Sequence, residues 1–123
     1  MTLIEVLVAV LIFSLGLVAL IGLQARAIQY STSAEDTSRA SLLANEIATT
    51  MITSQTIALP TSAITAWQAR ASDPIHGGLP NGAAAVAASG NVATITLTWR
   101  APTAAIGAPN SENRYVTQVV IPK

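Results

Sequence analysis

The sequence predicts an α+β fold, in which one long N-terminal helix packs its second half on a small antiparallel β-sheet. Three observations favour this fold. The chain has an apolar run without charge from Val6 to Leu23, no proline before Pro60, and a C-terminal stretch in which apolar residues alternate with threonine. The absence of proline allows one uninterrupted helix. Alternation with a period of two is typical of a strand with one buried face.

The apolar run is long enough to cross a membrane. A helix rises about 1.5 Å per residue, so about 20 residues span a hydrocarbon core of about 30 Å. Glu5 is the only ionisable side chain within residues 1–25. A secretory signal peptide normally begins with basic residues, and none precedes this run. We therefore expect residues 1–25 to form the transmembrane half of the helix, and residues 26–123 to form a head domain.

The helix is expected to become amphipathic from Gln24 to Ser54. Glu35 and Arg39 lie one turn apart, where they can pair on the exposed side. The opposite side is expected to face a protein core. Its residues recur at three- and four-residue steps and are Tyr30, Ala34, Thr37, Ser41, Ala44, Ala48 and Met51, with Leu43, Ile47 and Ile52 alongside.

A short helix near 61–71 and three strands are expected after the long helix. Turns are indicated by Asp73-Pro74, Gly77-Gly78 and Pro80-Asn81-Gly82. Because the apolar face of a sheet must be covered, the amphipathic half of the long helix is expected to pack on it. The strands are predicted near 83–89, 92–101 and 114–122, with a tight hairpin turn at Gly90-Asn91 and a flexible loop at 101–113.

Composition excludes several classes of function. The formal net charge is zero, only 10% of residues are charged, and there is one lysine, which argues against a nucleic-acid partner. No cysteine is present, so disulfides and cysteine metal sites are excluded. His76 is the only histidine, and it is interpreted as a solvated loop residue. We predict no catalytic residue, no metal site and no cofactor, and therefore a protein that is not an enzyme.

Other residues have a structural interpretation and a functional one. Trp67 and Trp99 are expected to pack in the core instead of stacking on a ligand. Arg100 and Arg114 flank the predicted loop and serve either solubility or a partner surface. The residues of 83–88 are small, which suggests an edge strand that another subunit could extend.

The N-terminal residues Met1-Thr2-Leu3-Ile4-Glu5-Val6, followed by the apolar helix to Leu23, resemble the start of type IV pilins and pseudopilins. A narrower resemblance is to the PilV-type minor pilins. It rests on Leu15-Gly16-Leu17, Gly22-Leu23-Gln24, Leu42-Leu43-Ala44-Asn45-Glu46-Ile47-Ala48, and the hairpin from Gly90-Asn91-Val92 into Thr96-Leu97-Thr98-Trp99-Arg100.

The chain departs from the pattern of major pilins in three places. Methionine replaces the usual first phenylalanine, Gly22 stands in the region where many major pilins have a proline, and no cysteine is available for a C-terminal disulfide. The last two departures favour a minor subunit over a major one.

The resemblance implies a fold, two functional residues and a set of partners. The fold is the type IV pilin fold. A prepilin peptidase removes a leader just before Met1, whose amine is then methylated. Glu5 pairs with the Met1 amine of a neighbouring subunit during assembly, and we expect no partner for Glu5 in its own chain. Alternatively, Glu5 lies in the headgroup zone at the edge of the bilayer.

The function implied is that of a minor pilin that helps to prime type IV pilus assembly in a tip complex and to present a tip adhesin. Its partners would be other minor pilins, the major pilin and the inner-membrane assembly platform. The chain would lie in the bacterial inner membrane with its head in the periplasm, and at the pilus tip or cell surface after assembly. The alternatives are a minor pseudopilin of a type II secretion system and a DNA-uptake pilin.

Overall fold

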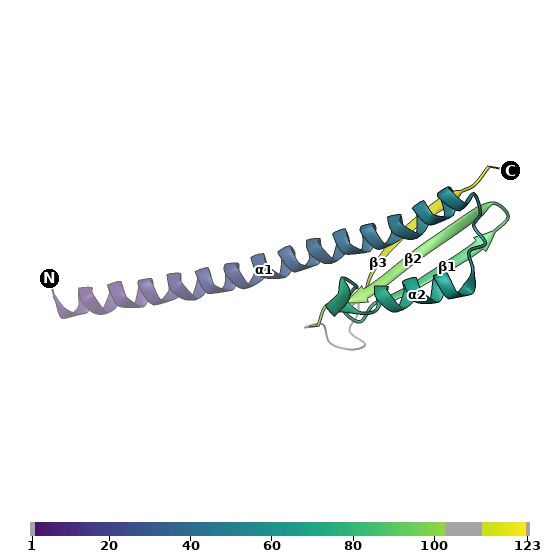
Figure 1. The fold of residues 1–123 in the computed structure, drawn as a ribbon. Helices are drawn as coiled ribbons and strands as arrows, with labels where there is room; N and C mark the ends of the chain where they lie inside the picture. Colours follow the sequence, from purple (N-terminus) through teal and green to yellow (C-terminus); the bar gives the residue numbers. More distant parts are fainter. Residues whose placement is uncertain (1, 103–111, 123) are drawn as a thin grey trace. The chain divides into compact units, whose positions relative to one another are not determined.

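The structure is a computed structural model that describes residues 2–102 and 112–122 (Figure 1). It divides into two compact units, 1–34 and 35–123, and helix α1 contributes to both. The boundary between the units follows Ala34. We expected the division after residue 25, close to the end of the apolar run. The elements are α1 (Leu3–Ser54), α2 (Thr61–Ala71), the 3-10 helix η1 (Pro74–His76), β1 (Ala83–Ser89), β2 (Val92–Arg100) and β3 (Glu112–Val120).

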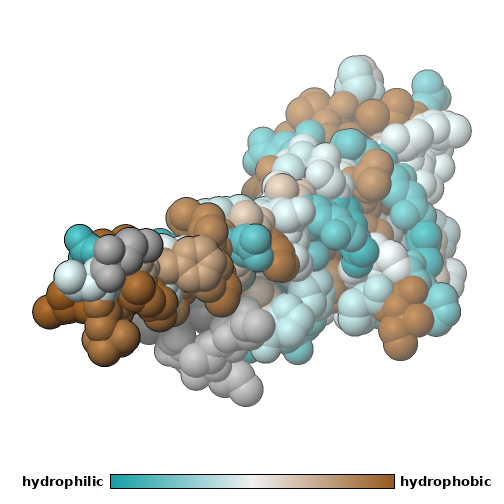
Figure 2. Space-filling view, turned by 90° about the vertical axis from the view of Figure 1, so that its left-hand side faces the viewer, coloured by the Kyte–Doolittle hydropathy of each residue, from teal (hydrophilic) through white to brown (hydrophobic). Residues whose placement is uncertain are grey.

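The first unit is formed by the N-terminal part of α1. Every residue from Thr2 to Glu35 is exposed, including large apolar side chains such as Phe13, which is 68% exposed. Figure 2 shows apolar side chains gathered on this part of the molecule. The helix is long enough and apolar enough to cross a membrane. Its backbone groups are hydrogen-bonded within the helix, so only apolar side chains would face the lipid.

Two hydroxyl groups in this unit bond to the helix itself. Ser14 Oγ donates to the carbonyl oxygen of Val10 at 2.8 Å, and Thr32 Oγ1 donates to that of Ile28 at 3.0 Å. Both bonds join residues four apart, so they need no second chain and no water.

The second unit contains an antiparallel sheet in the order β1-β2-β3. The long helix and the three-stranded antiparallel sheet confirm the predicted α+β class. Gly90, the first residue of the predicted hairpin turn, has a φ of 62°, as a two-residue type II′ turn requires of its glycine. This turn sets Ser89 opposite Val92 and fixes the register of β1 on β2.

The third strand begins earlier than the sequence predicts. We expected it at 114–122, whereas β3 starts at Glu112 and ends at Val120. Glu112 and Asn113 are polar and exposed, so hydrophobic alternation does not identify them, but their backbones pair with Arg100 and Trp99. Most of the predicted flexible loop lies outside the described residues.

The buried face of α1 matches the predicted one in part, since Leu43, Ala44, Ile47 and Met51 were predicted on it and are buried. The buried residues of the helix are Asp36, Ala40, Leu43, Ala44, Ile47 and Met51. Tyr30, Ala34, Thr37 and Ile52 were assigned to this face and are exposed. Tyr30 and Ala34 precede Asp36, the first buried residue of the helix. Ile52 follows Met51 directly and is therefore turned about 100° away from it.

The core lies on the inner face of β2, whose inward side chains are Ala93, Ile95, Leu97 and Trp99. Helix α2 also contributes to this core through Trp67, which is 2% exposed. The indole Nε1 of Trp67 donates to the carbonyl oxygen of Leu43 at 2.9 Å and ties α2 to α1. Gln68 Nε2 donates to the carbonyl oxygen of Ala84 at 2.9 Å and ties α2 to β1.

The segment after α2 turns so tightly that it requires glycine. A Cβ atom on Gly78 would lie 2.2 Å from the carbonyl oxygen of Arg70, far inside van der Waals contact. Arg39 Nη1 donates to the carbonyl oxygen of Gly78 at 3.4 Å and holds the turn against α1. Leu79 is thereby fully buried.

We expect Trp67→Ala to lower the free energy of unfolding by about 3–5 kcal/mol, because it leaves a cavity and removes a buried hydrogen bond. Trp67→Phe should cost less, since it keeps most of the ring volume. Urea unfolding of the full chain in detergent, followed by the fluorescence of Trp99, measures both. Ile75, which is 87% exposed, provides the control Ile75→Ala. Equal midpoints for Trp67→Ala and Ile75→Ala would contradict this account of the core.

Candidate functional site

The first turn of α1 carries a reciprocal hydrogen-bonded cap formed by Thr2 and Glu5. The backbone N–H of Thr2 donates to Glu5 Oε2 at 3.0 Å, and the backbone N–H of Glu5 lies 3.4 Å from Thr2 Oγ1. This is a capping box, in which a hydroxyl residue and a glutamate three positions later satisfy each other's free backbone N–H groups. The negative charge also lies at the positive end of the helix dipole.

This geometry corrects one expectation. We expected Glu5 to have no partner in its own chain, and it accepts a hydrogen bond from Thr2. The spacing Thr2-Leu3-Ile4-Glu5 is the sequence signature of a capping box and could have identified this contact. The proposed partner of Glu5, the Met1 amine, lies outside the described residues.

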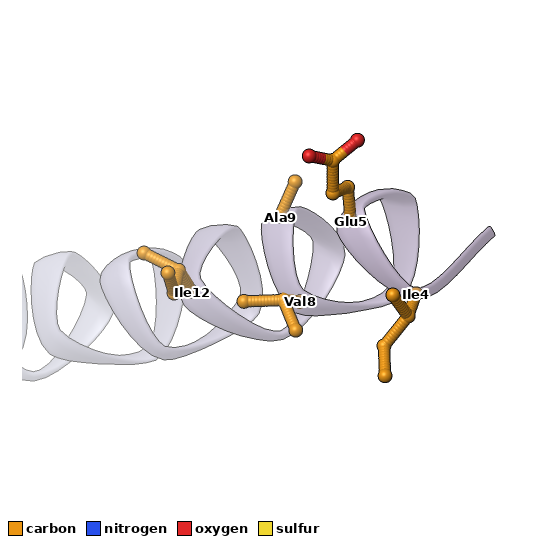
Figure 3. A pocket seen from close by; sticks show the side chains of 5 residues that line it. All are labelled: Ile4, Glu5, Val8, Ala9 and Ile12. Carbon is orange, nitrogen blue, oxygen red and sulfur yellow. The ribbon is translucent and has the colours of Figure 1, made fainter. Parts of the chain in front are cut away.

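Glu5 is flanked by shallow hollows on two sides of the helix. One hollow is lined by Glu5 and Ala9 together with Ile4, Val8 and Ile12. The other is lined by the same two residues together with Val6, Val10 and Phe13. Figure 3 shows the carboxylate of Glu5 and the methyl group of Ala9 on one side of the helix, while Ile4 and Val8 point to the other. The carboxylate is therefore exposed beside a small side chain.

His76 forms a hydrogen-bonded pair with the carboxylate of Asp73, which lies three residues before it. This spacing alone only weakly predicts such a contact. His76 Nδ1 lies 2.6 Å from Asp73 Oδ2, and Asp73 Oδ1 accepts from the backbone N–H of Ile75 at 3.1 Å. The hydrogen bond with His76 lowers the pKa of Asp73 below its usual range. Both side chains are on the surface of η1, and Asp73 caps this short helix. The pair stabilises a turn, and no nucleophile is hydrogen-bonded to it among the described residues.

No cluster of metal-binding side chains occurs in residues 2–102 and 112–122. The tryptophans predicted to be in the core, Trp67 and Trp99, are buried. The Nε1 of Trp99 and the Nε of Arg100 have no hydrogen-bond partner in the described part of the chain. Because the two residues are neighbours in β2, their side chains point to opposite faces of the sheet, and they do not form one site.

Comparisons of the chain with models of protein families, with curated proteins and with solved structures found no match.

Asp36 is the one buried charged residue in the described part of the head, and it is 5% exposed. Burial raises the pKa of its carboxyl group above the ordinary value of 3.8, although the positive charge of Arg39 acts in the opposite direction. Burial thus disfavours the ionised form. Because the folded state holds this proton more tightly than the unfolded state, the destabilisation caused by ionised Asp36 is absent below pH 3.8 and grows as the pH rises above that value.

We expect Asp36→Asn to stabilise the head at neutral pH, since an amide of similar shape has no charge to desolvate. The gain should be largest at pH 7 and should shrink as the pH falls toward 3.8. Urea unfolding of both proteins across this pH range measures it. A matched control is Glu112→Gln, which removes an exposed carboxylate from β3, away from Asp36. A constant difference between Asp36→Asn and the wild type at all pH values would contradict the role of ionisation.

Proposed function

We propose that this chain is a subunit of a type IV pilin-like filament, with residues 1–25 as the membrane anchor and filament core and residues 26–123 as the head. The observation that carries this proposal is a carboxylate one turn into an exposed apolar helix of membrane length. Such a helix must be covered by lipid or by other apolar helices. A carboxylate in that environment is costly unless it is paired.

The proposed partner of Glu5 is the Met1 amine of a neighbouring subunit, and Met1 is the proposed site of leader cleavage and N-methylation. In the membrane, Glu5 lies near one end of the apolar run, where water and headgroups solvate its charge. In a filament, the same carboxylate is surrounded by apolar helices and needs a cation from another chain. A pair of this kind directs assembly more than it adds stability, because desolvation offsets much of the attraction between the charges.

The head supports the narrower assignment to a minor pilin of a tip complex. It is small, has no disulfide and shows no metal-binding cluster among the described residues. Its proposed partners are other minor pilins, the major pilin and a tip adhesin. A prepilin peptidase and an inner-membrane assembly platform would act on the chain before it enters the filament.

We expect Glu5→Gln to reduce incorporation into filaments by at least about tenfold while membrane insertion is retained. The amide oxygen can still accept the N–H of Thr2, so the helix cap persists and only the charge is lost. The measurement is the ratio of the protein in sheared filaments to that in membranes of its own host. Glu35→Gln, the same change in an exposed pair with Arg39, should behave as the wild type. A normal filament fraction for Glu5→Gln would overturn the proposal.

A further inference from the structure

We infer that Ala9 is a positioning residue for the ion pair at Glu5. Its small side chain keeps open the side of the carboxylate by which the N-terminal amine of a second copy of this chain reaches Glu5 Oε1. This inference rests on the proposed function and adds to it a steric requirement one turn away from the charge.

The two oxygens of the Glu5 carboxylate have different roles. Oε2 accepts the backbone N–H of Thr2, and no described residue forms a hydrogen bond with Oε1. Each carboxylate oxygen has lone pairs for further hydrogen bonds. An incoming amine can therefore bind at Oε1 without breaking the capping box, so the helix end stays ordered while the charge is paired.

Ala9 determines the space beside that oxygen. Side chains of a helix lean toward its N-terminus, so the residue four positions after Glu5 covers the turn that carries Glu5. Both hollows beside Glu5 are lined by Ala9, and Figure 3 shows the methyl group of Ala9 and the carboxylate on the same side. A large side chain at position 9 would lie against the carboxylate and close this approach.

Charge complementarity identifies the occupant as a cation carried by another apolar helix. Residues 1–25 contain no basic side chain, and the first is Arg26. With leader cleavage before Met1, as proposed above, the Met1 amine is the cation that a neighbouring copy can bring to the level of Glu5 without burying an unpaired charge. The amine of the same chain is the competing occupant.

The test uses filaments assembled from the full chain in its own host, as a mixture of unlabelled and 15N-labelled copies. Dicyclohexylcarbodiimide activates a carboxylate in an apolar environment, and a contacting amine then displaces the urea to form an amide. Mass spectrometry of the linked peptides distinguishes a bond between two copies from a bond within one. We expect a Glu5–Met1 amide between copies in the wild type and in Ala9→Gly. Ala9→Leu should reduce its yield by about tenfold.

Ala19→Leu is the matched control, since it makes the same change at another exposed alanine of the helix, and it should leave the yield unchanged. A second readout separates positioning from general packing. In the Glu5→Gln background, Ala9→Leu should cause no further loss of filament incorporation, because the contact it obstructs is already absent. A packing defect would instead add to the loss.

Equal yields for Ala9→Leu and Ala19→Leu would overturn the inference while leaving the proposed function intact, provided that Glu5→Gln still blocks incorporation. A wild-type amide found only within single chains would also overturn it and would identify the chain's own amine as the partner. Normal incorporation of Glu5→Gln would instead remove the proposed function on which the inference depends.

Discussion

The backbone hydrogen bonding of α1 is the constraint on which the rest of the structure depends. From Leu3 to Ser54 the helix satisfies its interior N–H and carbonyl groups within itself. The first unit therefore needs no tertiary contacts to be folded, and its side chains alone decide what surrounds it. In the second unit, the C-terminal part of the same helix packs on the sheet and covers one of its faces.

The two uses of the helix correspond to different sequence patterns. Before Glu35 the side chains are exposed on all sides of the helix, so a face is not defined. From Asp36 onward, buried residues recur at Ala40, Leu43, Ala44, Ile47 and Met51. Trp67 links α2 to these residues of α1 through a hydrogen bond to the carbonyl oxygen of Leu43. The head is thus organised around a few contacts in the last third of the helix.

Much of the fold could be predicted because it follows from local patterns. The alternation in β2, the glycine of the hairpin turn and the lack of proline before Pro60 each act through neighbouring residues. The start of β3 at Glu112 could not be predicted in this way, because its first residues are polar and are held by pairing with β2. The buried face of the helix was predicted correctly at Leu43, Ala44, Ile47 and Met51. It was extended too far toward Tyr30, and Ile52 lies about 100° around the helix from Met51.

The candidate site shows the same division. The sequence shows the charge of Glu5 within an apolar run. The hydrogen bond from the backbone N–H of Thr2 to Glu5 was not predicted, although the capping-box spacing indicates it. The contact between His76 and Asp73 depends on the shape of η1, and the burial of Asp36 depends on packing of the head. Spacing alone could not predict either of these.

The hydrogen bond between Ser14 and Val10 has a consequence for how such helices recognise one another. The Ser14 hydroxyl already donates its proton within its own helix, and Glu5 is the only charged side chain in residues 3–23. The remaining surface is almost uniformly apolar. The apolar contacts between two such helices would therefore change little when one helix is shifted along the other. In the proposed filament, a single polar contact at Glu5 would therefore select one axial offset from many that are nearly equivalent.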